Sequence, residues 1–233
     1  MQIGLVSEPY SQVRADALIT YIFDTETKFD GVLGEINREM NGRLESLGAS
    51  GELTGKPLEL VLVHFPQGLA AQRLLLVGAG KPGKFSVADL RKIAGTALRY
   101  VKARGAKKLI FLTRERERGP EAAQAVVEGL IVADFESDKY RSERKKQEIE
   151  SVSLAGFDAG LGGDLITAVE QGRVIAESQN FARELINEPS NRLTPRMLAS
   201  RAEAMAKEAG LSIEILDERK IAELKMGALI GVA

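Results

Sequence analysis

Short apolar runs alternate along this chain with longer stretches in which apolar residues recur every three or four positions. Short runs rich in Leu, Val and Ile are typical of buried strands, and the three- and four-residue steps are typical of amphipathic helices. The pattern predicts strands at residues 3–6, 17–23, 58–65, 73–77, 108–113 and 152–155. It predicts helices at residues 32–47, 86–101 and 121–133.

Strands that alternate with helices of this length favour an α/β fold with a mixed, largely parallel sheet and flanking helices. Two successive pairs of strands, 3–6 with 17–23 and 58–65 with 73–77, have no helix between their members. We therefore expect some antiparallel pairing at the edge of the sheet.

A second part of the chain follows the sheet. Residues 136–150 are densely charged and predict a solvated loop, and residues 161–186 carry a long helical pattern that suits a connector between domains. We expect an N-terminal domain at 1–160, a connector helix at 161–188 and the beginning of a second α/β domain at 189–233. We expect that second domain to be incomplete, because the sequence stops within an apolar run.

The local signals after residue 188 are clear. Thr194 is a natural N-cap, Pro195 suits the first helical position, and Gly210 suits the position after a helix. Residues 212–216 alternate polar and apolar like a half-buried strand. Asp217 should cap a short helix that ends near Gly227, and residues 228–233 look like the start of another strand.

Composition excludes several classes of function. The chain has 32 basic and 33 acidic residues, a net charge of −1, one histidine and no cysteine. The charge balance provides no field for nucleic acid or an acidic membrane. The missing cysteine removes thiolate chemistry and fits a reducing cytoplasm. The N-terminus lacks signal-peptide character, and no apolar run approaches the ~20 residues of a membrane helix.

The loop at residues 78–83 resembles two phosphate-binding patterns. Gly78, Gly80 and Gly83 satisfy G-x-G-x-x-G, and residues 78–84 match most of a P-loop. However, Phe85 stands where a P-loop needs Ser or Thr, and Pro82 removes a backbone N–H. The helix should start at Ser86, with Asp89 three residues on as a near capping box, which leaves the third glycine outside the helix. No acidic residue ends the next strand to bind a ribose. We interpret the loop as a structural strand-to-helix turn.

The other candidate groups favour structural roles. His64, at the end of an apolar strand, is expected to be a packed structural residue, and residues 48–51 lack the last glycine of a nucleophile elbow. Asp134, Glu136 and Asp138 alternate as in a calcium loop, but Lys139 replaces the required glycine, so we expect a solvated helix end. The alternating charges of residues 114–118 predict a surface turn that pairs with itself. We assign no catalytic, cofactor-binding or metal-ligating residue.

Several segments together resemble the M17 leucyl aminopeptidase (cytosol aminopeptidase) family. The most specific is the Asn-to-Pro loop at 187–195 with its flanks, from Phe181 onward. Further similar segments are Leu216-Asp217, Met226-Gly227-Ala228-Leu229, residues 73–81, and Glu128-Gly129 with the residues that follow. The resemblance is dense after residue 181 and patchy before residue 70.

The resemblance implies a macro-domain-like N-terminal domain, a long helix and a C-terminal catalytic domain that removes N-terminal residues from peptides. It also implies a hexamer and two divalent metals, Mn or Zn, held by motifs around K-G-I-T-[FY]-D-[ST]-G-G and N-T-D-A-E-G-R. Neither motif occurs here, so no metal or catalytic residue is carried over and no cofactor is expected in this chain.

We therefore expect the N-terminal, non-catalytic portion of such a cytoplasmic enzyme, inactive alone, with peptide substrates for the full-length parent. One alternative is a macro-like module that binds ADP-ribose or another nucleotide at Gly78–Gly83. A dinucleotide-dependent oxidoreductase is disfavoured by the missing ribose acid and the position of Gly83.

Overall fold

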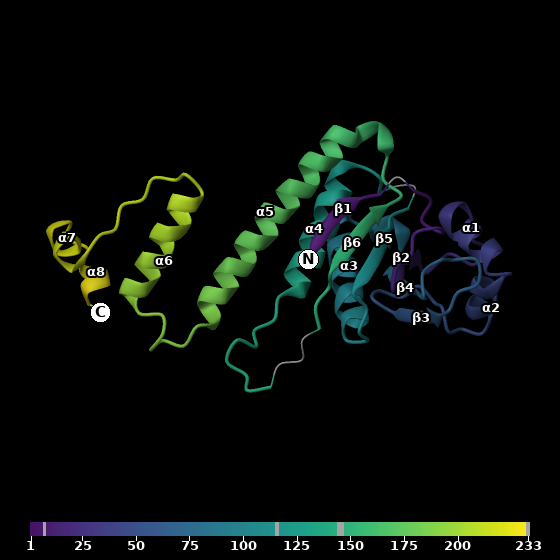
Figure 1. The fold of residues 1–233 in the computed structure, drawn as a ribbon, viewed down its shortest axis with the longest axis horizontal. Helices are drawn as coiled ribbons and strands as arrows, with labels where there is room; N and C mark the ends of the chain where they lie inside the picture. Colours follow the sequence, from purple (N-terminus) through teal and green to yellow (C-terminus); the bar gives the residue numbers. More distant parts are fainter. Residues whose placement is uncertain (7, 115–116, 144–146, 232–233) are drawn as a thin grey trace. The chain divides into compact units, whose positions relative to one another are not determined.

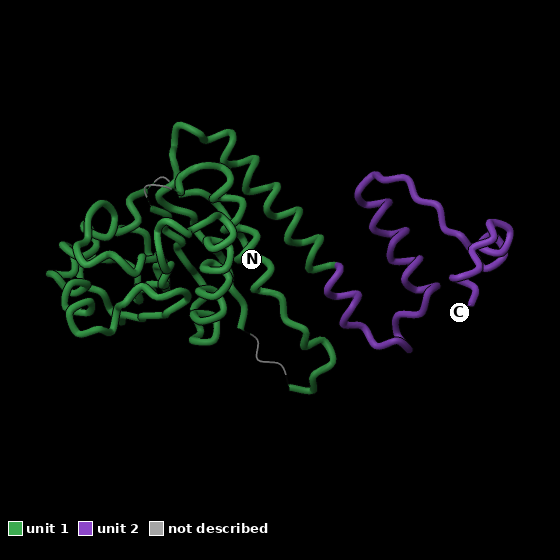
Figure 2. The backbone as a smooth tube through the Cα atoms, turned by 180° about the vertical axis from the view of Figure 1, so that it is seen from behind, with its two compact units in different colours: residues 1–181 green, residues 182–233 purple. Residues whose placement is uncertain are grey.

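The computed structural model describes residues 1–6, 8–114, 117–143 and 147–231. The chain divides into two compact units, residues 1–181 and 182–233 (Figure 2). Within the described residues, no helix combines the length and the apolar character that crossing a lipid bilayer requires.

Unit 1 is built on one six-stranded sheet in the order β1-β6-β5-β2-β4-β3 (Figure 1). All neighbouring strands are parallel except β3 and β4. The predicted mixed, largely parallel α/β fold is therefore confirmed. The strands are β1 (Gln2–Leu5), β2 (Ala17–Phe23), β3 (Leu60–His64), β4 (Arg73–Gly80), β5 (Lys108–Leu112) and β6 (Ser151–Ala155).

The expected antiparallel pairing is right for one pair of strands and wrong for the other. β3 and β4 pair antiparallel at one edge, as predicted. β1 and β2 do not pair, because β1 lies beside β6 at the opposite edge and β2 lies between β5 and β4. All seven residues of β2 are buried. A continuous apolar run of this kind fits a central parallel strand covered on both faces, whereas β1 is mostly exposed and fits an edge.

Three helices pack on one face of the sheet: α3 (Val87–Lys102), α4 (Pro120–Asp134) and the first half of α5 (Gly162–Asn187). The apolar residues of these helices pack against the β2 side chains that point to this face, and together they form one hydrophobic core. Gly129 of α4 lies against the backbone of α3, where an added Cβ would overlap the carbonyl oxygen of Arg91. A side chain at that position would therefore hold the two helices apart.

The opposite face of the sheet is covered by α1 (Gly31–Glu39) and α2 (Arg43–Ala49). The single helix predicted at 32–47 is therefore wrong. The break lies at Asn41 and Gly42, which both have left-handed backbone angles, with φ of 53° and 78°. The Asn37 side chain stabilises the break, since its Oδ1 accepts hydrogen bonds from the N–H groups of Leu44 (3.0 Å) and Glu45 (3.3 Å).

Unit 2 contains the end of α5, α6 (Pro195–Glu208), α7 (Glu218–Glu223) and α8 (Gly227–Ile230). The predicted caps are confirmed: Thr194 Oγ1 accepts from Met197 N (3.4 Å), and Asp217 Oδ1 accepts from Lys220 N (2.8 Å). The strand predicted at 212–216 is wrong, because these residues have no regular structure and no described residue of the unit forms a strand beside them. The strand predicted from residue 228 is wrong as far as Ile230, which ends a helical turn, and residues 232–233 lie outside the described residues.

Candidate functional site

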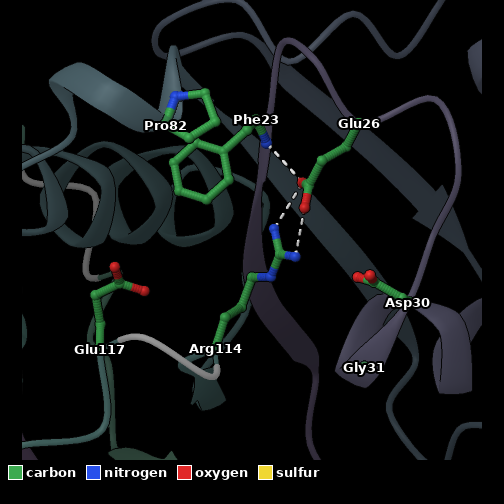
Figure 3. Close-up of a pocket in the computed structure, with 7 residues that line it drawn as sticks. All are labelled: Phe23, Glu26, Asp30, Gly31, Pro82, Arg114 and Glu117. Atoms are coloured by element: carbon green, nitrogen blue, oxygen red, sulfur yellow. Dashed lines mark hydrogen bonds and ion pairs between the residues drawn. The ribbon is translucent and has the colours of Figure 1, made fainter.

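The candidate site lies at the carboxyl ends of the central strands of unit 1. From β2 the chain crosses to α1 on one face of the sheet, whereas from β4 and β5 it crosses to α3 and α4 on the other. Ligands of open α/β sheets bind in crevices at such switch points. A hollow of about 440 Å³ occupies this position (Figure 3). It is lined by Phe23, Glu26, Asp30, Gly31, Pro82, Arg114 and Glu117.

A largely buried ion pair lines the hollow. The guanidinium of Arg114 donates to both carboxylate oxygens of Glu26, at 2.6 Å from Nη1 and 2.5 Å from Nη2 (Figure 3). Glu26 also accepts from the backbone N–H of Phe23 at 2.9 Å. The Arg114 side chain is 7% exposed and that of Glu26 is 19% exposed. Because bidentate pairs fix orientation as well as distance, this contact joins the loop after β2 to the loop after β5.

The prediction of a surface turn at residues 114–118 is right about the turn, because Glu117 N donates to Arg114 O at 3.0 Å. It is wrong about the surface position of Arg114, whose side chain is buried and pairs with Glu26. Glu117 accepts a hydrogen bond from the Tyr21 hydroxyl at 2.6 Å. Residues 115–116 lie outside the described residues. Alternating charges indicate a solvated turn only when no element elsewhere in the chain provides a buried partner. Here two such partners exist, Tyr21 of β2 for Glu117 and Glu26 of the following loop for Arg114.

Tyr21 anchors the second side of the hollow. Burial, together with its hydrogen bond to the Glu117 carboxylate, raises the pKa of the Tyr21 hydroxyl far above its ordinary value. The hydroxyl therefore remains protonated and acts as a donor. Its ring stacks on Phe85, with centroids 5.5 Å apart, and packs edge-on against Phe23. These contacts fix the position of Glu117 at the carboxyl edge of the sheet.

The chemistry that these residues can perform is limited. The described residues that line the hollow include neither a hydroxyl or thiol nucleophile nor a histidine base. Across residues 1–6, 8–114, 117–143 and 147–231, no group of three or more His, Cys, Asp or Glu side chains could hold a metal ion. The residues present thus do not fit the two divalent metals that the resemblance implies, and no catalytic step is derived from them.

The carboxylates at the end of α4 have a structural partner. The Lys102 ammonium lies 2.8 Å from Asp134 and 3.2 Å from Glu136. Burial lowers the pKa of Lys102, but the hydrogen bonds and charges of these two carboxylates outweigh it and raise the pKa overall. The calcium-like spacing therefore belongs to an ion pair that joins α3 to the end of α4.

The glycines at 78–83 also have structural explanations. β4 continues through Gly78 to Gly80, and a 3-10 turn, η1 (Pro82–Lys84), leads to α3. The capping box of Ser86 and Asp89 is present as predicted. An added Cβ at Gly78 would overlap the carbonyl oxygen of Lys56, whereas nothing lies within 4 Å of one at Gly83. The predicted strand-to-helix turn is confirmed, and packing explains the first glycine without a bound nucleotide.

The prediction for His64 is wrong. The side chain is exposed and its ring lies 6.4 Å from that of Phe65, which is 81% exposed. His64 ends β3, the terminal strand of the sheet, and among the described residues only β4 lies beside it. An apolar run predicts a strand, but it does not tell whether the strand is central or terminal.

Two models of known protein families match this chain. The family model for the N-terminal domain of the cytosol aminopeptidase family matches residues 22–144, and the model for its catalytic domain matches residues 180–233. The two models describe successive domains of one family of peptidases. The chain belongs to the cytosol aminopeptidase family.

Relatives and solved structures agree with this assignment. A probable cytosol aminopeptidase of Solibacter usitatus is 41% identical over the whole chain, which covers 45% of that relative. One of Acidobacterium capsulatum is 36% identical over the whole chain, which covers 48% of it. A mutant of tomato leucine aminopeptidase superposes with a TM-score of 0.87 at 26% identity, covering 100% of this chain and 48% of that one.

A more distant structure shares the fold. The bottromycin maturation enzyme BotP, in complex with Mn, has a TM-score of 0.67 at 24% identity, over 90% of this chain and 40% of that one. The chain spans about half the length of the curated relatives that it matches.

Proposed function

We propose that this chain supplies the N-terminal, non-catalytic portion of a metal-dependent leucyl aminopeptidase. In the proposed division, residues 1–160 form the macro-like domain, 161–188 the connector helix and 189–233 the beginning of the catalytic domain. The complete enzyme would remove N-terminal residues from peptides with two divalent metals, Mn or Zn. It would work in the cytoplasm as a homo-hexamer.

One observation carries this proposal. The N-terminal family model ends at residue 144, before the long helix α5, and the catalytic model begins at residue 180, within the last turns of α5, so both domains are represented in order. The family motifs that bind the metals are absent from the sequence, and the described acidic residues form no ligand set. The metal chemistry therefore falls to residues that this chain does not contain, and we expect the chain alone to be inactive.

A chimeric enzyme provides the test. Residues 1–233 would replace the corresponding part of the Solibacter usitatus relative, which is 41% identical over this length. Hydrolysis of leucine p-nitroanilide would be measured with added Mn²⁺ for the chimera, the unmodified relative and the chain alone. We expect metal-dependent hydrolysis by the chimera and the relative and none by the chain alone.

Two outcomes would refute the proposal. Metal-dependent turnover by residues 1–233 alone would contradict the non-catalytic assignment. A chimera that folds and binds Mn²⁺ but hydrolyses no aminoacyl substrate would contradict the assignment of residues 1–233 to such an enzyme. Circular dichroism and a metal-binding titration of the chimera distinguish the second outcome from simple misfolding.

A further inference from the structure

The terminal strand β3 presents unpaired backbone groups to its outer side. On its inner side, Phe65 N donates to Gln72 O (2.8 Å) and Glu59 O accepts from Gly78 N (2.8 Å). Antiparallel strands bond through alternate residues, so the odd-numbered positions face β4. The even-numbered positions therefore direct their N–H and C=O groups outward, and among the described residues no other strand lies beside them. These are Leu60, Leu62 and His64.

Within β3 itself, this edge lacks the features by which proteins usually prevent strand pairing. Charged side chains, proline and bulges protect most exposed edges. Positions 60–63 are Leu, Val, Leu and Val, and the register of β3 with β4 is regular throughout. An apolar, regular and uncovered edge is a template for an added strand.

A groove runs along the same edge. It has a volume of about 530 Å³, and the consecutive residues 61–67 line one side of it, so it follows the strand and not one face of the sheet. Helix α2 forms the opposite wall through Arg43 and Leu47, with Met40 just before it. A strand edge beside a helix is the arrangement in which peptides bind by strand addition.

The groove has a charge of opposite sign at each end. The hydrogen bond between Asn41 and Gln67 (3.1 Å) places the start of α2 near the carboxyl end of β3. The bond from Thr54 N to Glu59 (2.8 Å) places the residues after α2 near its amino end. Arg43 thus lies toward one end of the groove. Glu52 lies toward the other end.

Both charges are available to a ligand. Arg43 and Glu52 line the groove, both are exposed, and neither has an ion-pair partner among the described residues. A short peptide carries an ammonium group at one end and a carboxylate at the other, which matches this arrangement in one direction only. β3 has five residues, or ~17 Å at about 3.3 Å per residue, so a peptide of about five residues spans it.

We propose that this groove binds a short free peptide as an added strand, parallel to β3. The peptide carboxylate would lie near Arg43 and its α-ammonium near Glu52, while alternate apolar side chains pack toward Leu47. A second copy of the chain is the less suitable occupant. A stable dimer buries about 800 Å² on each partner, more than one five-residue edge supplies.

The test uses the pentapeptide Ser-Val-Leu-Val-Ser with free termini, titrated into the isotopically labelled chain and followed by amide NMR. We expect saturable shifts at the outward amides of Leu60, Leu62 and His64, with smaller shifts at Val61. Two N-methylated peptides distinguish the two edges of the bound strand. Methylation of the backbone nitrogens at positions 2 and 4 removes the N–H donors of one edge, and methylation at position 3 removes the donor of the other edge. One of these peptides should lose binding and the other should retain it.

Charge pairing is tested by a cycle of peptide and protein changes. Amidating the peptide carboxylate and the substitution Arg43→Gln should each weaken binding ~2- to 5-fold, as expected for an exposed ion pair. Together they should weaken it no further, because both remove the same pair. Acetylating the peptide α-ammonium and the substitution Glu52→Gln should likewise each weaken binding, and the two together should weaken it no further. Arg38→Gln, an exposed arginine of α1 outside the groove, is the matched control and should have no effect.

Three results would overturn the proposal. The first is an absence of shifts at these amides with millimolar peptide. The second is binding that neither N-methylated set reduces. The third is self-association of the chain that protects the same amides, which would assign the edge to a second copy.

Discussion

Replacing Gly78 by alanine should strongly destabilise unit 1, whereas the same change at Gly83 should not. Both glycines belong to one phosphate-binding pattern, yet the structure treats them differently. The new Cβ at position 78 would occupy the space of the Lys56 carbonyl oxygen, and that atom belongs to the backbone and cannot rotate away. At position 83 the new Cβ would meet nothing within 4 Å.

The size of the effect follows from the contacts around Gly78. Its N–H donates to Glu59 O (2.8 Å) and its carbonyl accepts from Leu58 N (2.7 Å), so displacing residues 56–59 breaks two hydrogen bonds. Each is worth about 1 kcal/mol, and overpacking adds about 1–3 kcal/mol. The lower entropy of the unfolded alanine chain offsets about 0.4–1 kcal/mol. We expect a net loss of about 3 kcal/mol for Gly78→Ala and a change within about 0.5 kcal/mol for Gly83→Ala.

Urea unfolding followed by circular dichroism measures both variants. With a slope of about 2–3 kcal/mol per molar, the midpoint of Gly78→Ala should fall by about 1 M or more, and that of Gly83→Ala should hardly move. Equal midpoints for the wild type and Gly78→Ala would refute the packing argument. A large loss at Gly83 would do the same, because the structure provides no contact to explain it.

Three further changes test other contacts of the structure. Arg114→Met should cost about 1–3 kcal/mol because it leaves the partly buried Glu26 carboxylate without its ion-pair partner. Adding Glu26→Gln should recover part of this loss in urea unfolding, and additive losses would contradict the pairing. Because the folded protein raises the pKa of Tyr21, this tyrosine contributes its full stabilisation below about pH 10. That stabilisation is lost at higher pH, where the tyrosine of the unfolded chain ionises. The variant Tyr21→Phe should therefore lose less stability at alkaline pH than the wild type, and identical pH profiles of the two proteins would refute this explanation. Thr194→Ala should cost about 1 kcal/mol in the first turn of α6, seen as faster amide exchange there, and unchanged exchange would show that the cap contributes nothing.

The parts of the fold that depend on local patterns could be predicted from the sequence. Helix α3 follows from an apolar stripe and from Ser86 with Asp89, which form its capping box within four residues. The parallel character of the sheet follows from alternating strands and helices. The order of the strands does not follow from local patterns, because β1 pairs with β6 across nearly the whole length of unit 1. The break at Asn41 is also missed, since apolar spacing continues through it.

The candidate site could not be predicted for a related reason. Its residues come from the loops after three strands, and the partners are far apart in sequence: Glu26 pairs with Arg114, and Tyr21 bonds to Glu117. Each residue alone has an ordinary interpretation, as part of a charged loop or of an apolar strand. The buried run of β2 contains two hydroxyl residues, Thr20 and Tyr21. Only Tyr21 gives a signal for the site, because a buried tyrosine normally requires a hydrogen-bond partner.

The same distinction between local and remote partners explains unit 2. The turn of α8 needs only local bonds, such as that from Gly231 N to Gly227 O at 2.9 Å, and it forms even though its side chains are exposed. Residues 212–216 have the alternation of a strand, but a strand is stabilised by a neighbouring ladder and by side chains across it. No described residue of unit 2 supplies that neighbour, and Ile213 and Ile215 remain 43% and 46% exposed. The sequence of residues 212–216 is therefore suited to pairing with a strand that the described part of the unit does not provide. The alternating pattern is present, but without a partner strand these residues do not form the predicted strand.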